Sequence, residues 1–324
     1  MNLLDSYYNT LSILVPPTRM VRSRTLNRVL HQLPYTRLRK PRIGLFQPDD
    51  LLGWSHRRAV EVVHPSYEFR ARYSIDEAGR RRTVPPPGRD VPDVLVLGCS
   101  WAFGHGVNDD ETLAQQLAGR GVGAENWACM GYGPTQAYLQ LRQAVEVGGL
   151  PCRPDGLVVY VWVPDQLMRA WRRREWVELN AWINPGRASH PVVDLEQGRL
   201  RPAGLIGPAE SVAEDPLLPG LVDRMEWRLT TALLRGLQEL AESVGRRFAV
   251  VTPPVPGGDR NRAKIATLQE LLAADQVPVI DLRELSGLPD DDLFYRFDGH
   301  PRAIWHEQVA GALAELEQRY IHAA

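Results

Sequence analysis

The sequence of 324 residues is poor in cysteine and lysine and contains no long apolar run. Its cysteines are odd in number and lack the spacing of metal ligands, so we expect neither a disulfide scaffold nor a zinc site. The three cysteines are Cys99, Cys129 and Cys152. Only two of the 38 basic residues are lysines, Lys40 and Lys264, and we interpret the excess of arginine as a coding bias and not as a phosphate-binding signal. No stretch of about 18 apolar residues occurs, so we expect no membrane-spanning helix.

The N-terminus also lacks the features of a signal peptide. No basic leader precedes its apolar stretch and no small-residue cleavage site follows it, so we expect a cytoplasmic location. Charge is almost balanced, with a formal net charge of -1, and nothing indicates a nucleic-acid partner. With 44% hydrophobic and 24% charged residues, the chain has the composition of a globular protein, which excludes global disorder, collagen and a coiled coil.

The first 90 residues differ from the rest and predict an N-terminal extension, residues 1–90. Residues 1–50 mix apolar and basic side chains at loose helical spacing, which indicates a helical arm packed on the main domain or a docking surface for a partner or membrane face. Residues 51–85 are rich in β-branched and aromatic side chains and predict a small β-element. The proline-rich stretch 84–92 is a stiff connector, so we expect a catalytic domain over residues 91–324.

From residue 93 onward, short apolar runs alternate with segments of helical periodicity. The runs predict strands at 93–98, 124–129, 156–163, 246–253 and 277–282. The intervening segments predict helices at 108–119, 134–149, 223–245, 261–275 and 301–320. Continuous apolar strands that alternate with helices are typical of a parallel sheet covered on both faces.

One segment of about 60 residues, 164–222, interrupts this alternation. Within it, residues 192–204 predict a hairpin. A connection of this length inside a compact domain indicates a lid, a binding element or disorder.

Chemically useful residues follow the predicted strands. Because ligands bind at the carboxyl ends of parallel strands, the residues just past each strand are candidates for an active site. Ser100 follows the first strand and Gly131 the second, while Asp298 and His300 precede the last helix. Each of these has an ordinary alternative interpretation, since serine caps helices and Asp-Gly-His forms turns.

Taken together, these residues are suited to acyl transfer. Ser100 is a nucleophile only if a base takes its proton, and His300 is the candidate base. Asp298 is the candidate that orients the imidazole. The backbone N–H groups of Ser100 and Gly131 are the candidate donors of an oxyanion hole.

The segments that carry these residues resemble the conserved blocks of SGNH (GDSL-type) esterases and lipases. LVLGCSWAFGHGV at 95–107 resembles the nucleophile block, and NWACMGYG at 126–133 resembles the block whose glycine donates to the oxyanion. VVYVWVPD at 158–165 occupies the place of the third block, and FDGHPRAIWHEQVA at 297–310 resembles the block of the catalytic aspartate and histidine. The resemblance spans roughly 93–320. It implies a flavodoxin-like three-layer α/β/α sandwich and a serine hydrolase or acyltransferase acting on a small ester or acylated molecule, with no metal and no cofactor.

Three positions depart from the family pattern. Cys99 precedes the nucleophile where the family has an acid, and a single residue separates Asp298 from His300. Pro164 stands where the family has an asparagine, so one oxyanion donor is missing, which could cost about 3 kcal/mol of transition-state stabilisation. Gln166 or a residue of the insertion could replace it, and Asp165 could instead bind a substrate hydroxyl or amine.

Other side chains are candidates for binding substrate. Trp101 and His105 lie in the nucleophile loop, and we consider both as substrate contacts. Arg169 and Arg172, with the neighbouring Arg173 and Arg174, could hold an anionic substrate or form a solvated face. For Cys99 we expect a buried packing role.

Three functions remain open at this point: an ester hydrolase, an acyltransferase acting on a sugar, peptide or other acceptor, and a binding module that has lost efficient chemistry. The α/β-hydrolase fold competes less well. Its Gly-x-Ser-x-Gly motif would need glycine where this chain has Ala102, and its acid usually lies well upstream of its histidine.

Overall fold

The structure is a computed structural model that describes residues 44–66, 68–180, 189–213, 220–256, 258–296 and 298–321. The helical arm expected in the first 50 residues, and the partner contact proposed for it, lie almost wholly in residues 1–43, outside the described part of the chain. None of the helices in the described part has the length and hydropathy of a membrane span.

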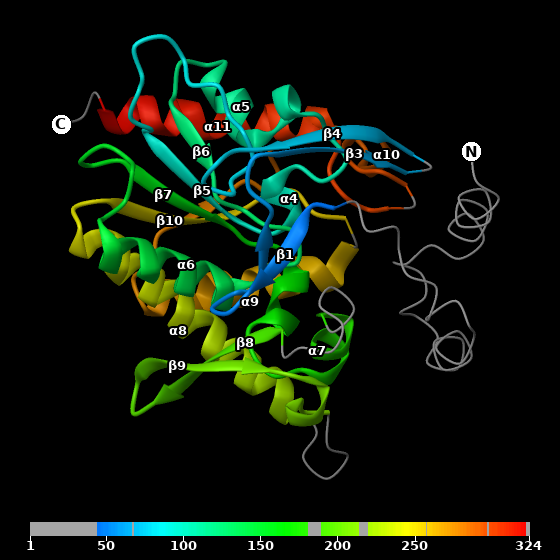
Figure 1. The fold of residues 1–324 in the computed structure, drawn as a ribbon, viewed down its shortest axis with the longest axis vertical. Helices are drawn as coiled ribbons and strands as arrows, with labels where there is room; N and C mark the ends of the chain where they lie inside the picture. The colour runs from blue at the N-terminus through cyan, green and yellow to red at the C-terminus, as the bar shows by residue number, and fades with distance from the viewer. Residues whose placement is uncertain are drawn as a thin grey trace.

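A five-stranded parallel sheet forms the centre of the fold (Figure 1). Its strands in chain order are β5 (Val94–Gly98), β6 (Ala124–Asn126), β7 (Leu157–Val161), β10 (Arg247–Thr252) and β11 (Val279–Asp281). Their spatial order is β6-β5-β7-β10-β11, which is the 2-1-3-4-5 order of the flavodoxin-like doubly wound fold. The strand order reverses between β5 and β7, so a ligand site is expected beyond the carboxyl ends of those two strands.

Helices cover both faces of the sheet (Figure 1). One layer contains α5 (Leu113–Ala118) and α11 (Ala303–Ile321), and the other contains α6 (Pro134–Val147), α8 (Leu221–Ser243) and α9 (Gly258–Ala274). This arrangement confirms the predicted three-layer α/β/α sandwich.

Side chains alternate between the two layers along each strand. In β5, Val94 and Val96 pack into the core beneath α5 and α11, whereas Leu95 and Leu97 pack into the core beneath α6 and α8. Both faces of β5 are therefore buried, which is the reason that its sequence is a continuous apolar run.

The ends of the helices follow the sequence signals. At the start of α5, Thr112 Oγ1 accepts the backbone N–H of Gln115 at 3.3 Å. Pro134 occupies the first turn of α6, and Gly148 follows its last residue.

The remaining described elements are short. They are β1 (Phe46–Asp49), β2 (Gly53–His56), β3 (Val60–Pro65), β4 (Arg70–Ile75), α4 (Ser100–Phe103), η2 (Asp109–Glu111), η3 (Pro164–Arg169), α7 (Arg174–Asn180), β8 (His190–Glu196), β9 (Arg199–Ile206), η4 (Pro208–Glu210) and α10 (Asp290–Leu293). The hairpin predicted within the insertion is β8–β9, and the insertion also carries η3, α7 and η4.

Two antiparallel hairpins, β1–β2 and β3–β4, precede the main sheet. Ala71, Tyr73 and Ile75 of β4 belong to the same apolar core as Val96 of the central strand. The hairpin β3–β4 thus contributes to the core of the domain that follows. The division into an extension (1–90) and a catalytic domain (91–324) stays a prediction.

Candidate active site

Ser100 lies directly beyond the carboxyl end of β5, at the first residue of α4. Gly98 makes this turn possible: its φ is +147°, and a Cβ there would lie 3.0 Å from both Ala102 Cβ and the carbonyl oxygen of Val161. Ser100 is 7% exposed, and Cys99 before it is fully buried, in agreement with the packing role expected for the thiol.

His300 and Asp298 contact or adjoin Ser100 although they lie about 200 residues further along the chain. His300 Nε2 lies 2.7 Å from Ser100 Oγ, and His300 Nδ1 lies 2.5 Å from Asp298 Oδ1. A tight turn brings the last two side chains together, because Gly299 between them has a φ of +80° and donates its N–H to Tyr295 O at 2.8 Å. A single intervening residue is therefore enough for Asp298 to contact His300.

The charges in this group favour an ionised aspartate. Burial would raise the pKa of Asp298, but the attraction of His300 and the contacts with His105 and His300 outweigh that effect. The pKa of the Asp298 carboxyl consequently lies well below its usual range. An anionic carboxylate beside Nδ1 favours the tautomer whose Nε2 can accept a proton from Ser100.

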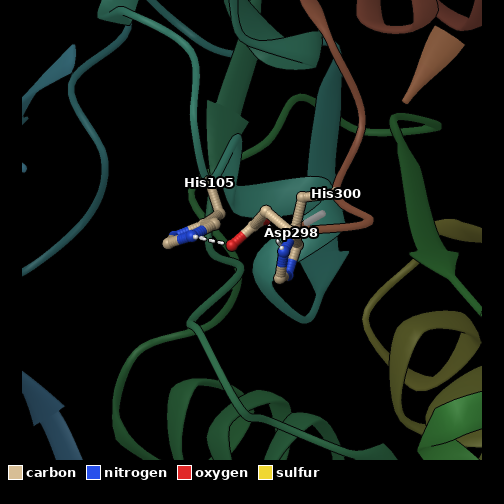
Figure 2. A group of neighbouring side chains, drawn as sticks. All are labelled: His105, Asp298 and His300. Atoms are coloured by element: carbon tan, nitrogen blue, oxygen red, sulfur yellow. Dashed lines mark hydrogen bonds and ion pairs between the residues drawn. The ribbon is translucent and has the colours of Figure 1, made fainter. Parts of the chain in front are cut away.

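His105 joins this group from the nucleophile loop (Figure 2). Its Nε2 lies 3.6 Å from Asp298 Oδ2, and its ring centroid lies 4.4 Å from that of His300. The residue is 8% exposed. The imidazole thus lies against the Asp298 carboxylate, and the substrate contact suggested for His105 stays a prediction.

The same three side chains have the residue types of a metal site. One potential ligand atom of each of His105, Asp298 and His300 lies within 4.8 Å of the others. Both ring nitrogens of His300 already lie at hydrogen-bond distance from protein oxygens, one from Ser100 and one from Asp298. The arrangement therefore fits a proton relay better than a cation site.

Gly131 lies in the loop between β6 and α6. Cys129 N–H donates to Gly98 O at 3.2 Å, which joins this loop to the end of β5. Gly131 has a φ of +83°, and a Cβ there would lie 3.1 Å from Trp54 Cζ2. The N–H groups of Gly131 and Ser100 donate to no other residue in the described part of the chain. Neither amide is therefore committed to a protein acceptor there.

The loop that contains Gly131 is held from two sides. Trp54 of β2 donates its indole N–H to Met130 O at 3.1 Å, and Tyr132 OH donates back to Trp54 O at 2.7 Å. Arg169 of the insertion donates to Tyr132 O at 3.1 Å and lies 4.5 Å from the ring centroid of Trp176. The sequence predicted none of these contacts.

The end of β7 provides no obvious substitute for the missing asparagine. Gln166 is fully buried, and its amide nitrogen donates to Val161 O at 3.1 Å while its oxygen accepts Tyr160 OH at 2.8 Å. These bonds tie η3 to the strand, and we do not assign Gln166 to the oxyanion. Pro164 is buried at the start of η3, and Asp165 is exposed.

The arginines of the insertion do not form a single anion site. Arg172 pairs with Asp194 at 3.1 Å, and Arg173 pairs with Glu226 at 2.6 Å. Arg169 donates to the backbone carbonyl of Tyr132. The three arginines therefore have separate partners, which does not support a common anion site. Trp101 packs edge-on against Trp305 at 5.7 Å between ring centroids.

Two residues that the sequence analysis did not single out hold the nucleophile loop. Asn126 donates from Nδ2 to Ala102 O at 3.1 Å, which fastens α4 to the end of β6. Arg81 is buried and donates to Gly104 O at 3.2 Å and Val107 O at 2.9 Å. A polar side chain at the end of an apolar strand was a usable signal for Asn126, whereas nothing local distinguished Arg81 from its arginine neighbours.

Comparison with known proteins gives fold-level likenesses only. No protein-family model matches the sequence, and no curated protein matches it. Similar solved structures include a lipolytic protein of the G-D-S-L family from Veillonella parvula, with 12% identity, a TM-score of 0.43, and coverage of 70% of this chain and 98% of that one. They also include the psychrotrophic esterase EstA from Pseudoalteromonas sp., with 10% identity, a TM-score of 0.42, and coverage of 71% and 98%.

A third similar structure is an acetylxylan esterase from Geobacillus stearothermophilus, with 13% identity, a TM-score of 0.39, and coverage of 73% of this chain and 96% of that one. The solved structures to which the chain is similar thus include hydrolases and esterases of the SGNH (GDSL) type, the family that its sequence motifs resemble.

Proposed function

We propose that the protein is a serine esterase of the SGNH type that works through an acyl-enzyme on Ser100. The proposal rests chiefly on one observation: Ser100 Oγ lies 2.7 Å from His300 Nε2, while His300 Nδ1 lies 2.5 Å from Asp298. A nucleophile, a base and a group that orients the base are thereby in hydrogen-bond contact at the strand-order reversal of the sheet.

In the proposed reaction, Ser100 Oγ attacks the ester carbonyl carbon as His300 Nε2 takes the hydroxyl proton. The tetrahedral intermediate collapses, the bond to the alcohol breaks, and His300 returns the proton to the leaving alkoxide. Water then attacks the acyl-enzyme with His300 again as base, and release of the acid restores Ser100. Asp298 stays anionic throughout and stabilises the imidazolium that forms at each step.

The oxyanion of this intermediate requires donors that are already in place. We assign them to the N–H groups of Ser100 and Gly131, since neither donates elsewhere in the described part of the chain. The donor set lacks the side-chain amide of the family pattern, because Pro164 has none.

Gly131→Ala is expected to lower kcat by about 100- to 1000-fold, the effect of losing one oxyanion donor, with little change in KM. The added methyl group would press on Trp54, and L-residues rarely adopt the φ of +83° found here, so the loop and its N–H must shift. The matched control is Gly121→Ala, which has a similar φ of +81° but no atom within 4 Å of the added Cβ. Equal kinetic losses in the two variants would contradict the assignment of Gly131.

A fluorophosphonate probe is expected to label the wild-type protein on Ser100, with loss of the fluoride leaving group, and to leave Ser100→Ala unlabelled. Peptide mass spectrometry identifies the modified serine, and Ser243→Ala, at the exposed end of α8, is the control. Labelling at another residue would refute the proposal. An unlabelled protein that still binds an ester would instead support a binding module.

The same acyl-enzyme could pass its acyl group to an alcohol in place of water. Release of p-nitrophenol from a short p-nitrophenyl ester should therefore be measured together with free acid and acylated acceptor. A large excess of acylated acceptor over free acid would identify an acyltransferase.

A further inference from the structure

Asp298 is held by more than His300. Its backbone N–H donates to Glu68 Oε2 at 2.7 Å, and Glu68 lies between β3 and β4, 230 residues away in the chain. The second oxygen of its carboxylate, Oδ2, lies 3.6 Å from His105 Nε2 (Figure 2). Two segments remote from Asp298 in sequence thus contact it, one at the backbone and one at the side chain.

His105 is in turn fixed by rings of the β3–β4 hairpin. The ring centroids of His64 and Phe69 lie 5.0 Å and 5.2 Å from that of His105, both in T-shaped geometry. The backbone N–H of His105 donates to Ser100 O at 2.9 Å. The position of the His105 ring relative to Asp298 therefore depends on both the hairpin and the nucleophile loop.

We propose that Glu68 and His105 are positioning residues that hold Asp298 in the orientation its hydrogen bond to His300 requires, and that the β3–β4 hairpin is therefore part of the active site. This inference rests on the proposed function, in which Asp298 orients the base. Glu68 and His105 act through Asp298 and take no part in bond making.

The physical reason lies in the freedom of an aspartate side chain. A carboxylate can rotate about its Cβ–Cγ bond, so a single hydrogen bond to His300 leaves its plane poorly defined. A contact at Oδ2 opposes that rotation, and a charged hydrogen bond to the backbone N–H fixes the turn that carries the side chain. At 3.6 Å the contact with His105 is longer than a good hydrogen bond, so we expect the larger effect from Glu68.

Glu68→Ala is expected to lower kcat by about 10- to 100-fold with KM unchanged, because a displacement of about 1 Å at a reacting group can slow a reaction about 100-fold. Glu68→Gln keeps an oxygen that accepts the Asp298 N–H and is expected to retain most of the activity. The control is Glu61→Ala, at an exposed position of the same hairpin. Thermal unfolding of each variant shows whether the fold is preserved.

His105→Phe keeps a ring but removes the donor, and we expect a loss in kcat of about 3- to 10-fold, smaller than for Glu68→Ala. His105→Gln, which retains an N–H donor, is expected to recover part of that loss. If Glu68→Ala and His105→Phe both keep wild-type kcat, the positioning proposal is wrong.

A double-mutant cycle separates positioning from general damage. In an Asp298→Asn background, Glu68→Ala should cost less than about 2-fold, since residues that act through a common partner are not additive. A full, additive loss in that background would overturn the proposal even if each single variant were impaired.

The positioning proposal and the proposed function fail in different ways. If Ser100→Ala retains full activity, the proposed function fails, and crystal structures of Glu68→Ala and His105→Phe still test the positioning of Asp298. A carboxylate of Asp298 that is displaced or rotated in those structures supports the proposal, and one that is unmoved overturns it.

Discussion

His300→Ala is expected to reduce kcat for ester hydrolysis by about 10⁶-fold, and Ser100→Ala by a similar factor. The two side chains act as one unit: the hydroxyl is a poor nucleophile until the imidazole 2.7 Å away takes its proton. The double variant should therefore be no slower than either single variant. Hydrolysis of a short p-nitrophenyl ester by purified protein measures all three.

Asp298→Asn should be less severe, at about 10⁴-fold, because an amide can hold the imidazole in the wrong tautomer while the nucleophile and base remain. The control is His56→Phe, which replaces another buried histidine, one that packs against Phe46 and Phe103. Full activity in both His300→Ala and Ser100→Ala would remove the basis of the proposed function.

Arg81→Met is expected to lower the free energy of unfolding by about 3 kcal/mol, the lower end of the range for removing one partner of a buried ion pair, because the Asp109 carboxylate is partly exposed. The Arg81 side chain has 0% exposure and lies 2.7 Å from Asp109. It also donates to the carbonyls of Gly104 and Val107, and without it the buried Val107 O would lose its donor, whereas Gly104 O would keep the N–H of Val107. Methionine fills much of the volume but supplies no donor.

Chemical denaturation of Arg81→Met and of Arg82→Met measures this effect. Arg82 is exposed, so its substitution should change the free energy of unfolding by no more than about 0.5 kcal/mol. Since Arg81 holds the loop that carries His105, the variant should also lose esterase activity at temperatures where it remains folded. Equal stability of the two variants would show that the buried network contributes little.

The sequence by itself determined the architecture of the main domain. The five apolar runs became the five strands of one parallel sheet. The central strands β5 and β7 are buried at every position, which explains their uninterrupted apolar sequences. Because ligands bind beyond the carboxyl ends of such strands, the sequence also predicted that Ser100 and His300 lie close together. They are 200 residues apart in the chain. These inferences needed only local periodicity and side-chain chemistry.

The supports of the site are different in kind, because they depend on pairing between distant segments. Arg80, Arg81 and Arg82 are identical neighbours, yet one pairs with Glu125, one is buried at the nucleophile loop and one is exposed. Antiparallel bridges join Arg81 to Ile75 of β4 on one side and to Asn126 of β6 on the other. This pairing alone decides that the side chain of Arg81, and not that of a neighbour, is buried.

The N-terminal hairpins illustrate the same limit. The sequence predicted a β-element there from its composition. It did not predict that Trp54 would donate to Met130 O, or that Glu68 would accept the backbone N–H of Asp298. Gln166 shows the opposite outcome. Its position in the sequence suggested an oxyanion donor, but its side-chain amide is hydrogen-bonded to Tyr160 OH and Val161 O. Local patterns specify which elements form and which side chains can react, while the packing of remote elements alone decides which polar groups remain free to meet a substrate.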